Sequence, residues 1–482
     1  MLGAAAAWLA AIAAATVDRQ AIASDDAFIS FQYARNLARG AGLVFNPGER
    51  VWGFTSPLQT VLLGALTWLG AETVRAAFIC GLAWVATAAV LLYRLSAEVL
   101  PRALALCAGL YFLLVPSMHG LYEMESALLV ALQLGCVIAA TTQRARLANL
   151  LGGLSCLARP DSLLLVLPVL LSARDTRRPR NLALFAAVGL AWEAFAFSYY
   201  GELLPNSLRA KQGLSPFGAF VANAATYVTN STLFAAFGPS SSTPMVGRIA
   251  LVLLNGTLLL RADLRRRPAV LYALVVYPWL LVGAYGVIGS ALGHNWELYS
   301  ARFFLQAGAT IGLLGLARQA AGRWPVRPAW RAPAAAALVA LTLACGVPQT
   351  VARVRELRSR STSHWLGARY DAYRRLAEWM EAHAAPGASV AVSEVGTLAY
   401  FSEVRIVDVS GIVTRGYAVD DRGDVGRFLQ RFAPRYAVVP GDHPTLQAGP
   451  SLHYRRVAFF PDRGYASMSL LALDTPSVGP PE

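Results

Sequence analysis

Charged residues are scarce in this chain. Only 15% of its 482 residues are Asp, Glu, Lys or Arg, whereas a soluble protein normally carries about 25%. Hydrophobic residues make up 56%, and the mean hydropathy is +0.46. This composition excludes an ordinary soluble protein. It predicts an integral membrane protein, long enough for a helical bundle and one modest soluble domain.

Lysine is almost absent, and cysteine shows no pairing pattern. Lys211 is the one lysine among 42 basic residues, so it stands out in a chain that otherwise uses arginine. The five cysteines lie in apolar runs without CxxC or CxxH spacing, which indicates small core residues rather than disulfides or zinc ligands. They are Cys80, Cys107, Cys136, Cys156 and Cys345.

The net charge of +14 does not indicate a nucleic-acid partner. The basic residues occur in short clusters between hydrophobic segments, as the positive-inside rule expects, and not as a patch on one soluble domain. No nucleic acid is therefore expected among the partners.

Eleven apolar segments are candidate membrane spans. Residues 2–17 lack a basic n-region and a cleavage site, so we interpret them as a first span and not as a signal peptide. The segments 147–158 and 161–173 are short and are expected to form a hairpin whose tip lies below the membrane surface. The remaining predicted spans are 73–93, 103–117, 124–141, 181–200, 246–261, 269–289, 303–318 and 332–349.

Basic clusters orient these spans. The positive-inside rule places residues 143–146, 173–180, 261–268 and 317–331 in the cytoplasm. Counting from them places the first loop and the tail outside, if residues 57–70 form a helix at the outer interface and do not cross. The prediction is a transmembrane domain, 1–349, with outer loops 18–72 and 201–245, and an extracytoplasmic domain, 350–482.

The tail differs in character from the rest of the chain. DAYRRLAEWMEAHA has the period of an amphipathic helix. The segments ASVAVSEVGTLAYF, VRIVDVSG and RYAVVPG are short β-like runs that end at Gly or Pro. The tail is therefore predicted to be a small α/β domain.

Polar clusters gather on the predicted outer side. Ionisable groups at membrane depth are costly and usually face a cavity or a partner, so five clusters predict one polar cavity open to the outer face. Simpler roles stay open: a helix cap for Asp25, a local ion pair for Arg159 and Asp161, a solvated charge for Lys211. The clusters are Asp25 and Asp26; Glu123 and Glu125; Arg159 and Asp161; Tyr199, Tyr200, Glu202, Asn206 and Lys211; and His294, Glu297 and Arg302.

Five segments resemble a known family in the same order along the chain. The first, residues 25–58, reads DDAFISFQYARNLARGAGLVFNPGERVWGFTSPL and is similar to the first outer loop of GT-C glycosyltransferases. The others are GLYEMESALL, LARPDSLLL, YYGELLPNSLRAK and SEVGTLAYFSEVRIVDVSGIV. Together they resemble the mycobacterial terminal β-1,2-arabinofuranosyltransferase family. Gln32, Trp52 and Ser162 depart from its usual Arg, Glu and Gly.

The resemblance implies a polytopic α-helical GT-C protein with about 11 membrane helices, interfacial helices and the small α/β tail. It implies an inverting enzyme of a bacterial inner membrane. Such an enzyme moves a sugar, here arabinofuranose, from a polyprenyl-phosphate donor to an extracytoplasmic cell-envelope glycan. Two alternatives remain: a hexose donor such as mannose, or a lipid-glycan transporter. A transporter often shows inverted repeats and polar groups near the midplane, and the sequence shows neither.

Glycosyl transfer needs a base for the acceptor hydroxyl and a cation for the departing phosphate. Asp25 or Asp26 is the candidate base, unless the pair holds a divalent cation through its oxygens. Arg159, Lys211 and Arg302 are candidates for the donor phosphate. Further expected substrate contacts are Tyr33, Asn46, Glu123, Glu125, Asp161, Tyr200, Asn206 and His294.

Overall fold

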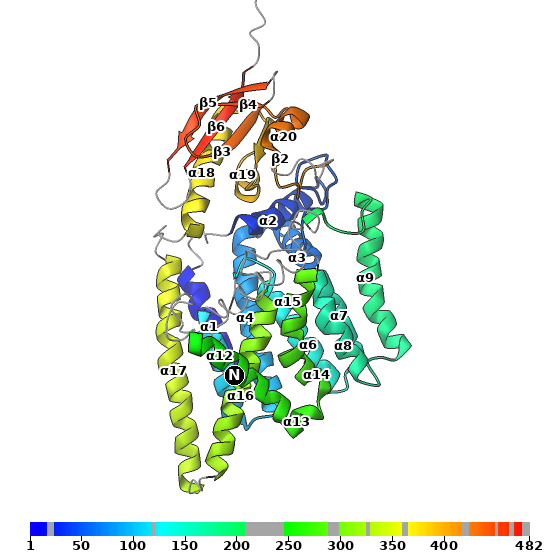
Figure 1. Ribbon diagram of the computed structural model, residues 1–482, viewed down its shortest axis with the longest axis vertical. Helices are drawn as coiled ribbons and strands as arrows, with labels where there is room; N and C mark the ends of the chain where they lie inside the picture. The colour runs from blue at the N-terminus through cyan, green and yellow to red at the C-terminus, as the bar shows by residue number, and fades with distance from the viewer. Residues whose placement is uncertain are drawn as a thin grey trace, which may run out of the picture. The chain divides into compact units, whose positions relative to one another are not determined.

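The computed structural model of the chain describes most of its residues. They are 1–16, 24–116, 119, 121–207, 245–287, 298–323, 328–358, 365–415, 424–448, 452–461 and 467–474. Within them the chain forms two compact units (Figure 1). The first comprises Met1–Arg19, Ala77–Ala194 and Lys211–Arg358, and the second comprises Gln20–Ala76, Phe195–Ala210 and Ser359–Glu482.

The first unit is helical. Its helices are α1 (Leu2–Thr16), α4 (Thr73–Ala97, in this unit from Ala77), α5 (Arg102–Leu114), α6 (Ser126–Thr141), α7 (Ala145–Ala158), α8 (Leu163–Ser172), α9 (Pro179–Tyr200, in this unit to Ala194), α12 (Met245–Gly256), α13 (Ala262–Arg265), α14 (Pro268–Leu271), α15 (Tyr277–Val287), α16 (Tyr299–Arg323) and α17 (Pro328–Arg358). Short 3-10 turns, η2 (Pro160–Ser162) and η5 (Thr257–Leu260), and the π-helical segment η6 (Tyr272–Val276) join some of them.

Each predicted span coincides with an apolar helical segment. Within the described residues, five helices are long and apolar enough to cross a membrane: Thr73–Ala97, Pro179–Tyr200, Pro268–Val287, Tyr299–Ala320 and Pro333–Arg355. Six shorter apolar segments match the other predictions: Leu2–Ala14, Arg102–Leu114, Ser126–Thr141, Ala145–Ala158, Pro160–Ser172 and Ile249–Leu260. The expected hairpin is present, since α7 and α8 are joined by η2 alone and its flanking arginine.

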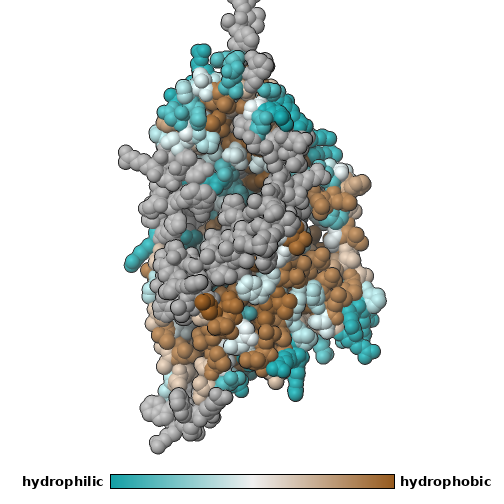
Figure 2. All heavy atoms as spheres, viewed as in Figure 1, coloured by the Kyte–Doolittle hydropathy of each residue, from teal (hydrophilic) through white to brown (hydrophobic). Residues whose placement is uncertain are grey.

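The surface of the first unit fits a membrane environment. Large apolar side chains are exposed along its helices, and they include Leu190, Leu253, Leu260, Trp279 and Leu316. Figure 2 shows hydrophobic side chains spread over these helices. Exposed apolar surface of this extent would be an aggregation hazard in water, whereas lipid tails cover it without cost.

The second unit combines two helices of the first loop with the tail. The loop supplies α2 (Asp25–Ala38) and α3 (Pro57–Trp68), and α3 is the helix predicted for residues 57–70. The predicted boundary at 349/350 falls inside α17. The structure groups the first loop with the tail, whereas the sequence interpretation placed it in the membrane domain.

The tail is an α/β domain, as predicted. Its elements are α18 (Trp365–His383), β1 (Ser389–Val392), α19 (Gly396–Phe401), β2 (Arg405–Asp408), α20 (Val425–Phe432), β3 (Tyr436–Pro440), β4 (Thr445–Ala448), β5 (Leu452–Phe460) and β6 (Met468–Leu473). The sheet order is β2-β1-β3-β6-β5-β4; β1 is parallel to β2 and β3, and the other pairs are antiparallel. Phe428 and Leu429 of α20 pack with sheet residues in the core.

One predicted β-like run is wrong in part. In ASVAVSEVGTLAYF only Ser389–Val392 forms a strand, and GTLAYF forms the helix α19. Tertiary contacts explain the difference, because the rings of Tyr400 and Phe401 pack against Phe28 of α2, each with centroids 5.2 Å apart. These contacts, and the capping described next, favour a helix where the local pattern favoured a strand.

Candidate active site

Asp25 links the first loop to the tail. It lies in the first turn of α2, is buried, and does not cap its own helix. Its carboxylate accepts hydrogen bonds from the backbone N–H groups of Gly396 (2.9 Å) and Thr397 (2.8 Å), the first residues of α19. Asp25 therefore satisfies two N–H groups that a helix start leaves without intrahelical partners. The sequence left open that Asp25 caps a helix. It does so, but the helix is α19, which begins 371 residues later, and not its own helix α2.

The two backbones approach closely at this contact. A Cβ atom on Gly396 would lie 1.9 Å from the carbonyl oxygen of Asp25. Only glycine fits at such a distance without a shift of the backbone. Asp26, the next residue, is half-buried in the same turn of α2. The two adjacent carboxylates therefore have different environments.

The side chains of Tyr33 and Asn46 form hydrogen bonds within the protein. The fully buried Tyr33 hydroxyl donates to the carbonyl oxygen of Val51 (2.7 Å) and accepts from the N–H of Gly53 (3.0 Å). Burial raises the pKa of Tyr33, so its hydroxyl stays protonated. The Asn46 side chain accepts from the N–H of Ile406 (3.0 Å) and donates to its carbonyl oxygen (2.9 Å). Asn46 thus pairs with the edge strand β2, and both residues shape the loop from within.

A second contact to the first loop comes from the tail, at the loop that follows the buried carboxylate of Asp408. Asp408 accepts hydrogen bonds from the N–H groups of Ser410, Ile412 and Val413. Burial raises the pKa of Asp408, and these bonds offset part of the rise. A Cβ on Gly53 would lie 2.7 Å from Val413 Cγ1, so the Asp408 loop packs directly on the first loop. The sequence interpretation did not single out Asp408.

Tyr200 and Asn206 attach the end of α9 to the same loop. The Tyr200 hydroxyl donates to the carbonyl oxygen of Leu43 (2.7 Å), and its ring stacks on Trp52 with centroids 6.0 Å apart. The N–H of Asn206 donates to the carbonyl oxygen of Trp52 (2.9 Å). The side chains of Tyr200 and Asn206 are half-buried. The structure therefore brings together Asp25, Asp26, Tyr33, Asn46, Tyr200 and Asn206 in the second unit.

The first unit holds a second cluster, around Arg159. This buried guanidinium forms ion pairs with Glu125 (3.1 Å) and Asp161 (2.9 Å). It also donates to the Tyr285 hydroxyl (2.8 Å), which in turn donates to Asp161 (2.6 Å). All three nitrogens of Arg159 have acceptors, and its two carboxylate partners give the cluster a formal charge of −1. The local ion pair considered for Arg159 and Asp161 is present.

A buried polar network adjoins this cluster in sequence. Ser162 Oγ accepts from Gln133 Nε2 (3.0 Å) and lies 2.7 Å from Ser155 Oγ. The Gln133 amide also donates to the Tyr277 hydroxyl, which bonds Ser300 (2.7 Å). The sequence interpretation missed this network, although one glutamine inside an apolar span was a signal for it.

The three departures from the family pattern all have partners. Ser162 belongs to the network above, and Trp52 stacks on Tyr200. Gln32 donates to the carbonyl oxygen of Phe45 (3.2 Å) and accepts from Arg35 (2.7 Å). Each departure is thus accommodated by local packing.

The remaining predicted site residues fall into two groups. Glu123 is buried ahead of α6, and Arg302 is half-buried in the first turn of α16; both belong to the first unit. Lys211 and His294 lie outside the described residues. Within the described part of the chain, no three His, Cys, Asp or Glu side chains gather as a metal site requires.

Parts of the chain are similar in sequence to known proteins. A family model described as a domain of unknown function (DUF8728) matches residues 359–474. The terminal β-(1→2)-arabinofuranosyltransferase of Mycobacterium tuberculosis (strain ATCC 25618 / H37Rv) is 33% identical over 216 residues. That alignment covers 39% of this chain and 34% of the relative, so the match spans about a third of the relative's length.

Two solved structures share the fold over nearly the whole chain. ArnT from Cupriavidus metallidurans in the apo state has a TM-score of 0.58 and 14% identity, and covers 97% of this chain and 98% of its own. ArnT bound to undecaprenyl phosphate has a TM-score of 0.55 and 12% identity, with 99% and 98% covered. The resemblance expected from the sequence is confirmed: the chain has the GT-C fold of ArnT with a small C-terminal α/β domain, and part of it is similar to a mycobacterial arabinofuranosyltransferase.

Proposed function

We propose that this protein is an inverting glycosyltransferase that uses a polyprenyl-phosphate sugar as its donor. The fold shared with ArnT supports this, since one of the ArnT structures is bound to undecaprenyl phosphate. The partial similarity to a terminal arabinofuranosyltransferase favours arabinofuranose as the sugar and an extracytoplasmic cell-envelope glycan as the acceptor.

Asp26 is the proposed general base. The observation that carries this assignment is the geometry of Asp25, whose two oxygens accept backbone N–H groups of α19. A carboxylate whose two oxygens both accept backbone N–H groups has few lone pairs left for an acceptor hydroxyl or a cation. Asp26 shares the first turn of α2 and is only half-buried, so an acceptor hydroxyl can approach it. A base in hydrogen-bond reach of the attacking hydroxyl contributes about 10²–10⁴-fold to the rate.

Arg302 and Lys211 are the proposed phosphate contacts. Arg159 was also a candidate. Its single positive charge is paired with two carboxylates, Glu125 and Asp161, and a cluster with a net negative charge repels phosphate. We therefore assign Arg159 the role of holding Glu125 and Asp161 in place for the sugar. Lys211 keeps its proposed role because an ammonium is compact and strongly hydrated, unlike a guanidinium.

Two other functions remain as competing proposals. A hexose donor such as mannose would need the same fold and the same base. A lipid-glycan transporter would need no base at all. The partial similarity to an enzyme that transfers arabinofuranose favours the first proposal over both.

An assay with defined donors separates these proposals. The purified full chain is incubated with labelled polyprenyl-phosphoryl arabinofuranose or mannose and an arabinan acceptor, and the product linkage is read by NMR. We expect transfer from the arabinofuranosyl donor with inversion at the anomeric carbon. Faster transfer from the mannosyl donor would establish the hexose alternative. Donor movement across vesicles without transfer would establish the transporter.

A further inference from the structure

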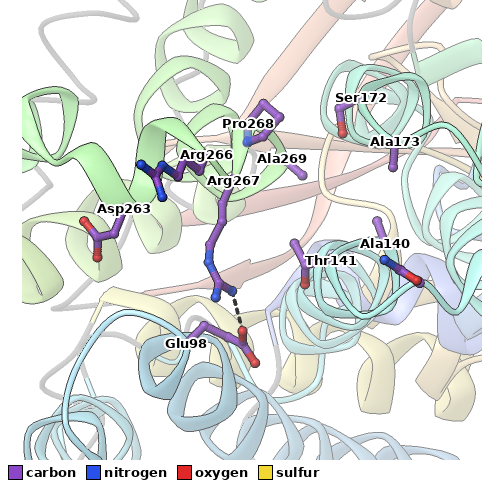
Figure 3. A pocket seen from close by; sticks show the side chains of 11 residues that line it. Glu98, Ala140, Thr141, Ser172, Ala173, Asp263, Arg266, Arg267, Pro268 and Ala269 are labelled. Atoms are coloured by element: carbon purple, nitrogen blue, oxygen red, sulfur yellow. Dashed lines mark hydrogen bonds and ion pairs between the residues drawn. The ribbon is translucent and has the colours of Figure 1, made fainter.

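Two cavities lie next to each other at one end of the first unit. They share Gln143, which lies between α6 and α7. One has a volume of about 600 Å³ and is drawn in Figure 3; the other has a volume of about 520 Å³. Both are lined by loops and helix ends in or next to the basic clusters that the positive-inside rule places in the cytoplasm.

The cavity in Figure 3 is close to neutral. Its ionised residues are two acidic and two basic side chains, Glu98, Asp263, Arg266 and Arg267. Arg267 is bonded to Glu98, as the dashed line shows, and Asp263 accepts from Arg261 at 2.6 Å. The hydrogen bond from Arg261 lowers the pKa of Asp263. This cavity therefore offers little unpaired charge to a ligand.

The neighbouring cavity, here called the arginine pocket, is strongly basic. It is lined by Arg144, Arg146, Arg178 and Arg180, and by one carboxylate, Asp175. Asp175 pairs with Arg178 at 2.7 Å. The other three arginines form no ion pair within the part of the chain that the structure describes. Three guanidinium groups facing one cavity repel one another unless an anion joins them.

Apolar surface begins at the edge of the arginine pocket. Leu147 lines the pocket and is 40% exposed, and Leu150, further along α7, is 37% exposed. Leu171, in the last turn of α8 that leads into the pocket's second loop, is also exposed. A free phosphate would gain nothing from these leucines. A phospholipid would place its headgroup among the arginines and its acyl chains along α7 and α8.

We propose that the arginine pocket binds the headgroup phosphate of an anionic membrane phospholipid. Arg144, Arg146 and Arg180 donate to the phosphate oxygens, and a guanidinium can do so with two parallel N–H groups. Basic pockets between membrane helices on the cytoplasmic side are suited to such headgroups. The bound lipid joins the start of α7 to the start of α9, and so fixes the start of α9.

The test is native mass spectrometry of the full chain in detergent with added dioleoylphosphatidylglycerol or dioleoylphosphatidylcholine. We compare the wild type, Arg144→Gln/Arg146→Gln and a control, Arg266→Gln/Arg318→Gln, which removes the same charge from exposed arginines outside the pocket. The pocket variant should bind phosphatidylglycerol about thirtyfold more weakly, or about 2 kcal/mol at 1.4 kcal/mol per factor of ten. The control should bind like the wild type.

Each other outcome overturns the proposal. Equal losses in the two double variants would show general charge attraction and no pocket. Equal binding of phosphatidylcholine would show that the negative charge is not recognised. Displacement of the lipid by millimolar inorganic phosphate would show a site for free phosphate.

A charge-preserving variant separates lost binding from misfolding. Arg144→Lys/Arg146→Lys keeps the charge and should retain most of the binding.

Discussion

At the scale of single residues, Asp25 and Asp26 differ although they are adjacent and chemically identical. Asp25 is 6% exposed and accepts two backbone N–H groups of α19, whereas Asp26 is half-buried. A buried charge that accepts hydrogen bonds from a helix start contributes mainly to stability. The partly exposed carboxylate next to it, Asp26, is the one that we propose as the base.

Asp25→Asn is expected to destabilise the second unit. The asparagine keeps one oxygen, but its NH₂ group would face an N–H group of Gly396 or Thr397 and leave it without a partner. An unsatisfied buried donor costs about 1–3 kcal/mol. The loss should appear as a lower Tm of the purified protein.

Asp424→Asn is the matched control for that measurement. Asp424 also accepts from a helix-start N–H, that of Arg427 at 2.8 Å, but its side chain is exposed. Asparagine is as good a helix cap as aspartate at an exposed site. Tm should stay near that of the wild type. If Asp25→Asn leaves Tm as unchanged as Asp424→Asn does, Asp25 has no stabilising role.

At the scale of elements, α2 and α19 are packed as closely as their backbones allow. Gly396→Ala would place Cβ 1.9 Å from the carbonyl oxygen of Asp25 and 2.9 Å from Cβ of Phe28. The backbone must then shift and both hydrogen bonds to Asp25 must lengthen. Overpacking of this kind costs about 1–3 kcal/mol or more. Denaturant or thermal unfolding should show the loss.

Gly426→Ala tests the same change in a roomy position. Gly426 lies in α20, where the nearest atom to an added Cβ is Asp424 Oδ1 at 3.4 Å, an ordinary contact. Alanine in a helix is favoured over glycine by about 1 kcal/mol. This variant should be neutral or more stable. Equal behaviour of the two alanine variants would contradict the close packing described for α2 and α19.

The positions of the helices were easier to predict from the sequence than the tertiary contacts between elements. Membrane helices follow from apolar runs, because the bilayer requires long hydrophobic segments, so the span predictions coincide with helices. The helix α19 is different: six residues with a β-like pattern become helical through contacts with α2, far away in the chain. No local pattern contains that information. The hydrogen bonds of Tyr33 and Asn46 could not be predicted for the same reason.

At the scale of the whole molecule, basic loops from separate parts of the chain meet at one end of the first unit. The 143–146, 173–180 and 261–268 clusters line two cavities that share Gln143. The positive-inside rule predicts that this end is cytoplasmic. The C-terminus should then lie on the extracytoplasmic side. An alkaline phosphatase fused after Glu482 should be active, and a green fluorescent protein fused there should not fluoresce. The reverse pair of results would invert the topology and remove the basis for an outer polar cavity.

The measurement that tests the central claim most directly is turnover of Asp26→Asn. With labelled polyprenyl-phosphoryl arabinofuranose and an arabinan acceptor, kcat should fall about 10²–10⁴-fold, because the general base is lost. The substitution keeps the shape of the side chain, so Tm should stay near that of the wild type. A variant that keeps more than about a tenth of the wild-type kcat would lie outside the range for a lost base. It would contradict Asp26 as the base and with it the proposed mechanism.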